Sequence, residues 1–287
     1  MTQSKPNFYL VAHSHGVSLL DAIANWREKF RVSGTPDANF GSAFQGWFNG
    51  SIIRDTFRTE VVEPTLPMEA IEAWVISFRD GLGALARLDT SGAGGTLQVV
   101  ERFSRILASW NGPIPIVSML NGNEPARTML ANSPAYDFLD AEIAGVEKGV
   151  PIIDELFIEQ TISTWVDAVY YSLVAVKRLV NNPLVHVLPP PPRLNPHLSP
   201  YLEGMLDRAT ADDFLPDRLR VKWYRRYCRR LISYLAAIDC QVLAPPPEAC
   251  TASGLLKEEY AEGISHANSR YGLLVARQLA STLGLAR

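Results

Sequence analysis

Two polar segments near opposite ends of the chain contain the residue types that perform acyl transfer. Ser14 stands in Ala12-His13-Ser14-His15-Gly16, directly after an apolar run, and His266 lies close to the other end of the sequence. A serine hydroxyl is a weak nucleophile until a neighbouring base, most often a histidine, accepts its proton. Ser14 and His266 are therefore the first candidates for a nucleophile and its base.

The tetrahedral intermediate of acyl transfer also needs fixed hydrogen-bond donors, and the sequence offers three kinds. Ser14 precedes a predicted helix and can offer its own N–H. A glycine of the middle region, among Gly41, Gly46 and Gly50, can offer a backbone N–H, and the Asn123 side-chain amide follows another apolar run. Loss of one such donor typically lowers turnover by roughly 100- to 1,000-fold. These groups are the candidate oxyanion donors.

The segments between these residues alternate between short apolar runs and longer amphipathic ones. Apolar runs bounded by polar turns predict strands at 7–12, 114–120, 184–188 and 241–244, with a further strand within 51–62. Helical spacing predicts helices at 17–30, 68–88, 97–110, 153–179, 219–238 and 271–283. This α/β alternation predicts a mostly parallel sheet covered on both faces, and such sheets bind ligands beyond the carboxyl ends of their strands. The candidate residues fall in the turns at those ends.

The order and spacing of four segments resemble the SGNH (GDSL-type) hydrolase family along the whole chain. The segments are Ala12 to Gly16, a glycine near Gly50, Gly122-Asn123-Glu124, and Ser265-His266-Ala267-Asn268 followed by Tyr271-Gly272. The runs at 136–138, 187–192 and 242–247 are also similar to an uncharacterised bacterial subgroup of that family. The resemblance implies a three-layer α/β/α, flavodoxin-like sandwich. It implies Ser14 as nucleophile, His266 as base, and Ser14, Gly50 and Asn123 as oxyanion donors.

Two positions depart from the family pattern. His13 stands where the family usually has an aspartate, and Gly263 stands where it usually has the acid, three residues before the base. Glu262 is one residue further back and is our candidate for the acid that orients His266. In a serine protease, replacing such an acid lowers turnover roughly 10⁴-fold because the wrong histidine tautomer is populated. The presence of an orienting acid therefore decides how active such a site is.

These departures leave three functions open. The first is a serine esterase that hydrolyses a small acyl ester, such as an O-acetyl ester, through an acyl-serine intermediate, without cofactor or metal. The second is a protein that keeps the fold but has weak or no catalysis and serves as a ligand-binding or interaction module. The third is an acyltransferase that uses the same residues to pass the acyl group to a sugar. The expected partner of the catalytic forms is a small-molecule or glycan ester.

Simpler roles compete with the catalytic ones. Ser14 before a helix is also a typical N-cap, and Asn123 after a strand is also a typical turn residue. The segment around Ser14 is close to the Gly-x-Ser-x-Gly elbow of α/β-hydrolases, but it comes too early in the chain for that fold. His13 and His15 alternate along an extended segment, so their side chains point to opposite sides and chelate a metal poorly.

The composition bounds the class of protein and its partners. The chain has 287 residues, 47% of them hydrophobic, and we predict one domain spanning residues 1–287. A net charge of −3 gives no reason to expect a nucleic-acid partner. We expect a solvated face for the arginines of 219–238, which are Arg225, Arg226, Arg229 and Arg230. Three cysteines without metal spacing, and no run approaching ~20 apolar residues, predict a cytoplasmic protein without a membrane partner.

Overall fold

The computed structural model of this protein describes residues 7–13, 15–24, 53–55, 71–75, 85–91, 95–121, 135–196, 214–263 and 265–285. Within these residues a six-stranded sheet has the order β2-β3-β1-β6-β7-β8. In that order, the strands are β2 (Ile53–Asp55), β3 (Ile71–Val75), β1 (Phe8–Ala12), β6 (Ile116–Met119), β7 (Leu184–Val187) and β8 (Gln241–Leu243). Neighbours from β3 to β8 pair in parallel, and β2 pairs antiparallel with β3 at the edge.

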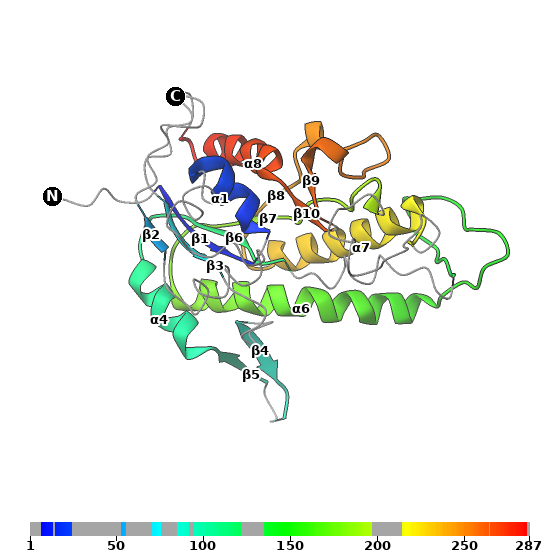
Figure 1. Cartoon of the computed structure of the whole chain (residues 1–287). Coiled ribbons are helices and arrows are strands. Elements are labelled where there is room, and N and C mark those ends of the chain that lie inside the picture. The colour runs from blue at the N-terminus through cyan, green and yellow to red at the C-terminus, as the bar shows by residue number, and fades with distance from the viewer. Residues whose placement is uncertain are drawn as a thin grey trace, which may run out of the picture.

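Helices cover both faces of this sheet (Figure 1). The helices α1 (Gly16–Ala24) and α8 (Ser269–Thr282) lie side by side on one face, and α4 (Glu101–Trp110), α6 (Glu155–Leu179) and α7 (Asp217–Ala236) cover the other. The central strand β1 serves both layers because alternate side chains of a strand point to opposite faces. Its Leu10 packs with α1 and α8, and its Val11 packs with the other three helices. The predicted three-layer α/β/α sandwich is confirmed.

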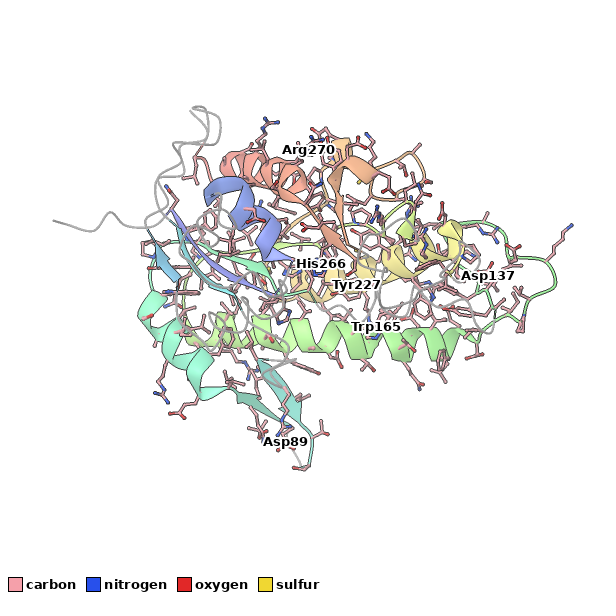
Figure 2. The ribbon with its side chains drawn as sticks, in the orientation of Figure 1. Asp89, Asp137, Trp165, Tyr227, His266 and Arg270 are labelled. Carbon is pink, nitrogen blue, oxygen red and sulfur yellow. The ribbon has the colours of Figure 1, made fainter. Side chains whose placement is uncertain are left out.

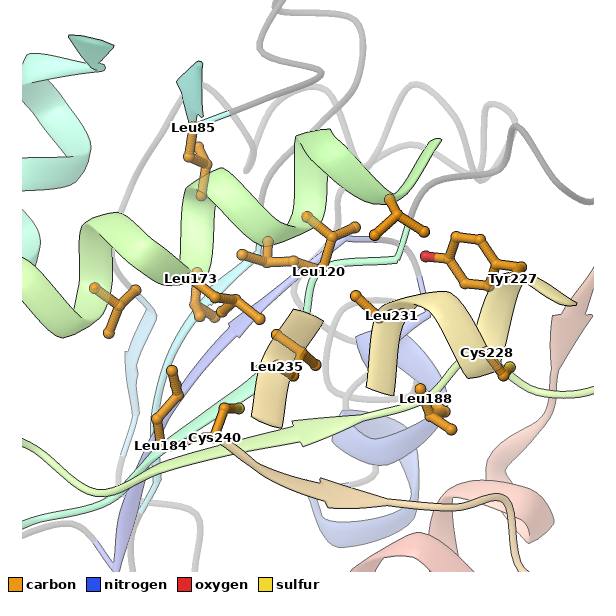
Figure 3. Packing of buried hydrophobic residues seen from close by; sticks show 14 of the residues in the cluster. Leu85, Leu120, Leu173, Leu184, Leu188, Tyr227, Cys228, Leu231, Leu235 and Cys240 are labelled. Carbon is orange, nitrogen blue, oxygen red and sulfur yellow. The ribbon is translucent and has the colours of Figure 1, made fainter. Parts of the chain in front are cut away.

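The larger apolar cluster fills the space between the sheet and the helices α4, α6 and α7. Figure 3 shows part of it, where Leu173 of α6 and two leucines of α7, Leu231 and Leu235, belong to the same cluster as the leucines that directly follow β6 and β7, Leu120 and Leu188. Full burial of one such side chain stabilises the fold by ~1.5–3 kcal/mol. Both β6 and β7 are buried along their whole length, as expected of central strands covered on both faces.

The strand order indicates where sheets of this type usually bind ligands. Numbered by their order in the chain, the parallel strands follow the sequence 2-1-3-4-5 across the sheet, which is the flavodoxin-like order. The chain runs from β1 to β3 on one side and then returns to β6 on the other side of β1, and sheets of this order usually bind ligands at that reversal, between the carboxyl ends of the two strands β1 and β6. The segments that follow these two strands are those that carry Ser14 and Asn123 in the sequence.

Capping side chains set the beginnings of two helices. Asp154 accepts a hydrogen bond from the Leu156 N–H (2.8 Å) and begins α6. Asn268 accepts hydrogen bonds from the N–H groups of Arg270 (3.0 Å) and Tyr271 (3.3 Å) and begins α8. A cap of this kind typically contributes ~1 kcal/mol. The second cap fixes the start of α8 directly after the segment that contains the candidate base.

Two of the predicted helices are wrong in whole or in part. The described residues of 68–88 form no helix; they hold β3 and the start of β4 (Ala86–Asp89), which pairs antiparallel with β5 (Thr96–Val99) in a hairpin that projects past α6 in Figure 1. The β-branched and aromatic residues of 71–75 favour a strand, and pairing with β1 outweighs their helical spacing. The predicted helix 97–110 begins only at Glu101 because the residues before it belong to the hairpin.

The sequence predicts a solvated face for four arginines of α7, and three of them, Arg226, Arg229 and Arg230, instead belong to an ion-pair network. Arg226 pairs with Asp140, Glu155 and Glu159, and Arg229 also pairs with Asp140. Burial alone would raise the pKa of the Asp140 carboxyl, but hydrogen bonds from both arginines outweigh this effect and lower the pKa to about 2. The irregular segment after residue 135 is thereby fastened to α6 and α7.

Candidate active site

His266 lies in a short hairpin that precedes α8. Its strands, β9 (Ala261–Glu262) and β10 (His266–Ala267), pair antiparallel, with Glu262 directly opposite His266. Directly opposed residues in an antiparallel pair project from the same face, with Cβ atoms roughly 4.5–5.5 Å apart. Gly263, at the family's acid position, lies in the turn with a left-handed φ of 61°, a conformation that glycine adopts without strain. The structure therefore brings the candidate acid and the candidate base together.

Side chains on both sides hold this hairpin in place. The Arg193 Nη1 donates to the Gly263 carbonyl (2.8 Å), and its Nε and Nη2 donate to one carboxylate oxygen of Glu258 (3.0 and 2.6 Å). The Asn268 Nδ2, beyond the other strand, donates to the Ala261 carbonyl (3.3 Å). Because these bonds reach the turn and the strand opposite the base, they restrict the backbone that sets the direction of the imidazole.

The side chains of Ser265 and His15 contact the His266 ring. The Ser265 Oγ lies 3.3 Å from Nδ1, and the His15 ring stacks on the His266 ring with a centroid separation of 4.9 Å and an interplanar angle of 27°. His15 follows Ser14 in the sequence and is only 5% exposed. The ring contact therefore joins the turn after β1 to the hairpin before α8. Figure 2 shows His266 near the middle of the molecule, well away from Asp137 at its far end.

Ser14, Gly50 and Asn123 lie outside the described residues, so their roles as nucleophile and oxyanion donors stay predictions. The structure does describe His13, which follows β1, and Asn121, which follows β6. The His13 Nδ1 lies 3.4 Å from the Asn121 carbonyl oxygen. The segments that lead to the predicted nucleophile and to the predicted amide donor are thus in contact at the carboxyl ends of these strands.

A buried polar network joins β6 and β7 next to this edge. The Asn121 Nδ2 donates to the Val187 carbonyl (2.9 Å), so the amide oxygen is the acceptor and receives the His186 Nε2–H (3.1 Å). The other ring nitrogen of His186 then accepts the Ser118 hydroxyl proton (3.1 Å). All three polar side chains are fully buried. The Asn121 amide is therefore engaged in the scaffold, where it fixes both the turn and the tautomer of His186.

Burial keeps two histidines near the site neutral at pH 7. It lowers the pKa of His186 to about 3 and that of His13 to about 4, although a hydrogen bond to the Asn121 backbone offsets part of the shift at His13. His13 stands where the resembled family usually has an aspartate. A neutral side chain thus stands where the resembled family has an anion in the turn after β1. Position 13 therefore contributes no charge to the candidate site at neutral pH.

Sequence reasoning did not single out His186 or Ser118. A signal was present, because a histidine and a serine interrupt the otherwise apolar runs 184–188 and 114–120, and a polar side chain in a buried strand requires a buried partner. Their partnership depends on register: Ser118 pairs directly with His186 between β6 and β7. That register follows from sheet packing and is not visible in either run alone.

Among the described residues, no three or more histidine, cysteine, aspartate or glutamate side chains are grouped as metal ligands usually are. His13 and His15 contact different partners, Asn121 and His266. None of the helices in the described part of the chain has the length and apolar character that crossing a bilayer requires.

Comparisons with known proteins give likeness to solved structures alone. No protein-family model and no curated protein matches the sequence. The chain is similar to a carbohydrate acetylesterase from Sinorhizobium meliloti, with 12% identity, a TM-score of 0.43 and coverage of 96% of this chain and 98% of that one. It is also similar to a protein from Streptococcus pneumonia provisionally described as a platelet activating factor, with 12% identity, a TM-score of 0.42 and coverage of 99% and 86%. At such low identity, any conclusion about function depends on the residues of this chain itself.

Proposed function

We propose that the protein is a serine hydrolase of the SGNH kind, which cleaves a small acyl ester through an acyl-serine intermediate. The observation that carries this proposal is the pairing of Glu262 with His266 in a hairpin whose histidine contacts the turn after β1. A carboxylate beside an imidazole, next to a turn with a serine in its sequence, has the composition of a catalytic triad. The carboxyl ends of β1 and β6 are also the usual ligand position in this strand order.

In the proposed reaction, the Nε2 of His266 takes the hydroxyl proton of Ser14 while the serine oxygen attacks the ester carbonyl carbon. The carbonyl electron pair moves onto the carbonyl oxygen, and the Ser14 N–H, the Gly50 N–H and the Asn123 amide hold that oxyanion. The intermediate then collapses, the bond to the alcohol oxygen breaks, and His266 gives its proton to the departing alcohol. Water attacks the acyl-serine by the same steps and releases the acid.

Glu262 is proposed as the acid of this triad. When the Nε2 of His266 faces the nucleophile, Nδ1 must carry the other ring proton, and a nearby carboxylate favours both this tautomer and the imidazolium that forms. The cross-strand position supplies that charge even though the residue three before the base is a glycine. The Ser265 hydroxyl, 3.3 Å from Nδ1, offers a neutral acceptor on the same side of the ring.

One observation favours a second candidate, a ligand-binding module with weak or no catalysis. The Ser265 hydroxyl lies at Nδ1, which is the atom that a triad acid usually contacts. A neutral hydroxyl stabilises an imidazolium less than a carboxylate does, because a hydrogen bond to an ionised group is roughly twice as strong as a neutral one. A site that relied on Ser265 in place of Glu262 would bind an ester or a related ligand and turn it over slowly.

Covalent labelling with a fluorophosphonate probe, which reacts with activated serines, separates the two candidates. For the hydrolase we expect labelling of the purified protein and hydrolysis of p-nitrophenyl acetate, both lost in Ser14→Ala. A matched control is Ser109→Ala, which removes an exposed hydroxyl on α4 in the opposite layer and should change neither readout. Labelling that persists in Ser14→Ala contradicts the proposed nucleophile. A folded protein with no labelling and no turnover supports the binding module.

A further inference from the structure

The ring of His15 lies against the ring of His266, although His15 is neither the proposed nucleophile nor the base nor an oxyanion donor. The two rings stack with a centroid separation of 4.9 Å and an interplanar angle of 27°. His15 is buried, whereas His266 is partly exposed. A buried ring that covers one face of the base limits the directions in which the base can turn.

The contact between α1 and α8 holds this stack in place. A Cβ at Gly272 would lie 1.9 Å from the carbonyl oxygen of Ser18 and 2.8 Å from the backbone nitrogen of Leu19, so no side chain fits there. The first turns of the two helices are therefore in backbone contact, and His15 and His266 stand just before those turns. The Ser18 hydroxyl also donates to the His15 carbonyl (3.0 Å), which fixes the turn that carries the ring.

We propose that His15 is a positioning residue that holds the plane of the His266 imidazole by face-to-face ring contact. Proton transfer needs the nitrogen of the base to point at the hydroxyl, and the terminal torsion of a histidine side chain is broad when nothing restrains it. Stacking acts on the ring face, whereas both ring nitrogens lie at the ring edge. His15 can thus fix the plane without occupying the atoms that exchange protons. This inference rests on the proposed hydrolase function.

Three substitutions separate the aromatic face of His15 from its nitrogens. His15→Phe keeps a planar ring and removes both nitrogens, His15→Leu removes the ring at similar volume, and His15→Asn keeps polar atoms without a ring. We expect His15→Phe to retain kcat within about threefold. We expect the other two to lose kcat by roughly 10- to 100-fold with little change in KM, because a misplaced catalytic group costs up to ~10²-fold.

A spectroscopic readout reports the ring contact directly. A proton near the face of a stacked aromatic ring resonates upfield, so the Cε1–H signal of His266 should keep its upfield position in His15→Phe and lose it in His15→Leu and His15→Asn. Far-UV circular dichroism identifies a temperature at which all variants are folded, and kcat is compared there. Because His15→Leu and His15→Phe both remove a buried polar ring, a difference between them reports on the aromatic face.

The outcomes distinguish this inference from the proposed function. A kcat in His15→Phe as low as that in His15→Leu, or a His15→Leu variant as fast as wild type, overturns the positioning role. If Ser14→Ala leaves turnover unchanged, the hydrolase proposal fails and the positioning role fails with it. If Ser14→Ala abolishes turnover while the Phe and Leu variants behave alike, only the role of His15 is overturned.

Discussion

Glu262 and His266 stand directly opposite each other across the β9–β10 pair, so a carboxylate four residues before the base shares its face of the hairpin. In the family that the sequence resembles, the acid stands three residues before the base, and Gly263 occupies that position here. The left-handed φ of Gly263 takes it into the turn, and the residue before it becomes the one opposite the base. Glu262 and His266 can therefore lie close together although one more residue separates them than separates the acid and base of the resembled family.

The first prediction is that Glu262→Gln lowers kcat/KM at least about tenfold, because the neutral amide no longer stabilises the imidazolium; the full loss of an orienting acid costs up to ~10⁴-fold. Steady-state hydrolysis of p-nitrophenyl acetate measures the effect. Glu259→Gln is the matched control, since it neutralises an exposed carboxylate in the same segment, and it should leave turnover unchanged. Ser265→Ala should lower kcat/KM by less than about threefold, because a neutral hydroxyl stabilises the imidazolium less than a carboxylate does. A larger loss in Ser265→Ala than in Glu262→Gln would contradict the assignment of the acid.

The second prediction concerns the contact between α1 and α8. Gly272→Ala places a Cβ on the Ser18 carbonyl, so one of the two helices must shift, and overpacking of this kind typically costs ~1–3 kcal/mol of unfolding free energy. The same shift separates the stacked histidines and should lower kcat in the fraction that remains folded. Urea unfolding and steady-state kinetics measure the two effects. Ser281→Ala, on the exposed side of α8, is the control and should change neither. A Gly272→Ala variant with wild-type stability would refute the close approach.

The third prediction is a loss of stability in mild acid caused by His13 and His186. In the unfolded chain both take a proton near their ordinary pKa of 6.5, whereas in the folded protein burial lowers their pKa values to about 4 and about 3. Between those values the unfolded state binds more protons, so stability is full above pH 6.5 and decreases as the pH falls toward the folded values. With both residues contributing, the free energy of unfolding should fall by up to about 2.7 kcal/mol per pH unit.

Urea unfolding at a series of pH values measures that slope. His186→Gln keeps hydrogen-bonding groups at this position but does not titrate, so it should reduce the slope to about half. The comparison uses the slope and not the absolute stability, which the substitution also changes. A slope that is the same in wild type and variant would mean that His186 does not bind a proton on unfolding.

The fourth prediction is an asymmetry within the buried pair of Lys222 and Asp137. The Lys222 ammonium donates to Asp137 (2.8 Å) and to the carbonyls of Phe138 (2.7 Å) and Gly145 (2.9 Å), while Asp137 also accepts from Arg218 (2.9 Å). Asp137→Asn leaves a fully buried ammonium without a counter-charge and should cost ~3–5 kcal/mol of unfolding free energy. Lys222→Met should cost less, because the carboxylate keeps its bond to Arg218. Urea unfolding of both variants gives the order, and the reverse order would refute this account.

Four of the five parallel strands could be located from the sequence. β1, β6, β7 and β8 are short apolar runs ended by polar or proline-rich turns. β6 and β7 are apolar because they are covered on both faces, whereas β8 lies at the edge of the sheet and is only partly buried. The sequence of β3 also fits a helix, because residues 71–75 mix a glutamate with apolar residues whose spacing suits either period. Its pairing with β1, a contact to residues far away in sequence, decides the outcome.

In the candidate site, too, some features depend on neighbouring residues and others on contacts between segments that are far apart in the sequence. Glu262 and His266 could be named from their sequence neighbourhood, and their direct opposition depends on the turn at Gly263. The stacking of His15 on His266 could not be read from either segment, because it depends on the close approach of α8 to α1 at Gly272. Ser14, Gly50 and Asn123 stay predictions that depend on order, spacing and resemblance.

Because successive side chains of β1 point to opposite faces of the sheet, substitutions on one face can leave the packing of the other face unchanged. Leu10 and Val11 are neighbours in sequence, yet they belong to different apolar clusters on opposite sides of the sheet. Energetic effects of substitutions that are well separated and share no partners usually add. The face that carries the hairpin of His266 can therefore acquire substitutions that change the reaction at the site. The ion-paired face around Lys222 keeps its contribution to the free energy of unfolding and so offsets the destabilisation that such substitutions cause.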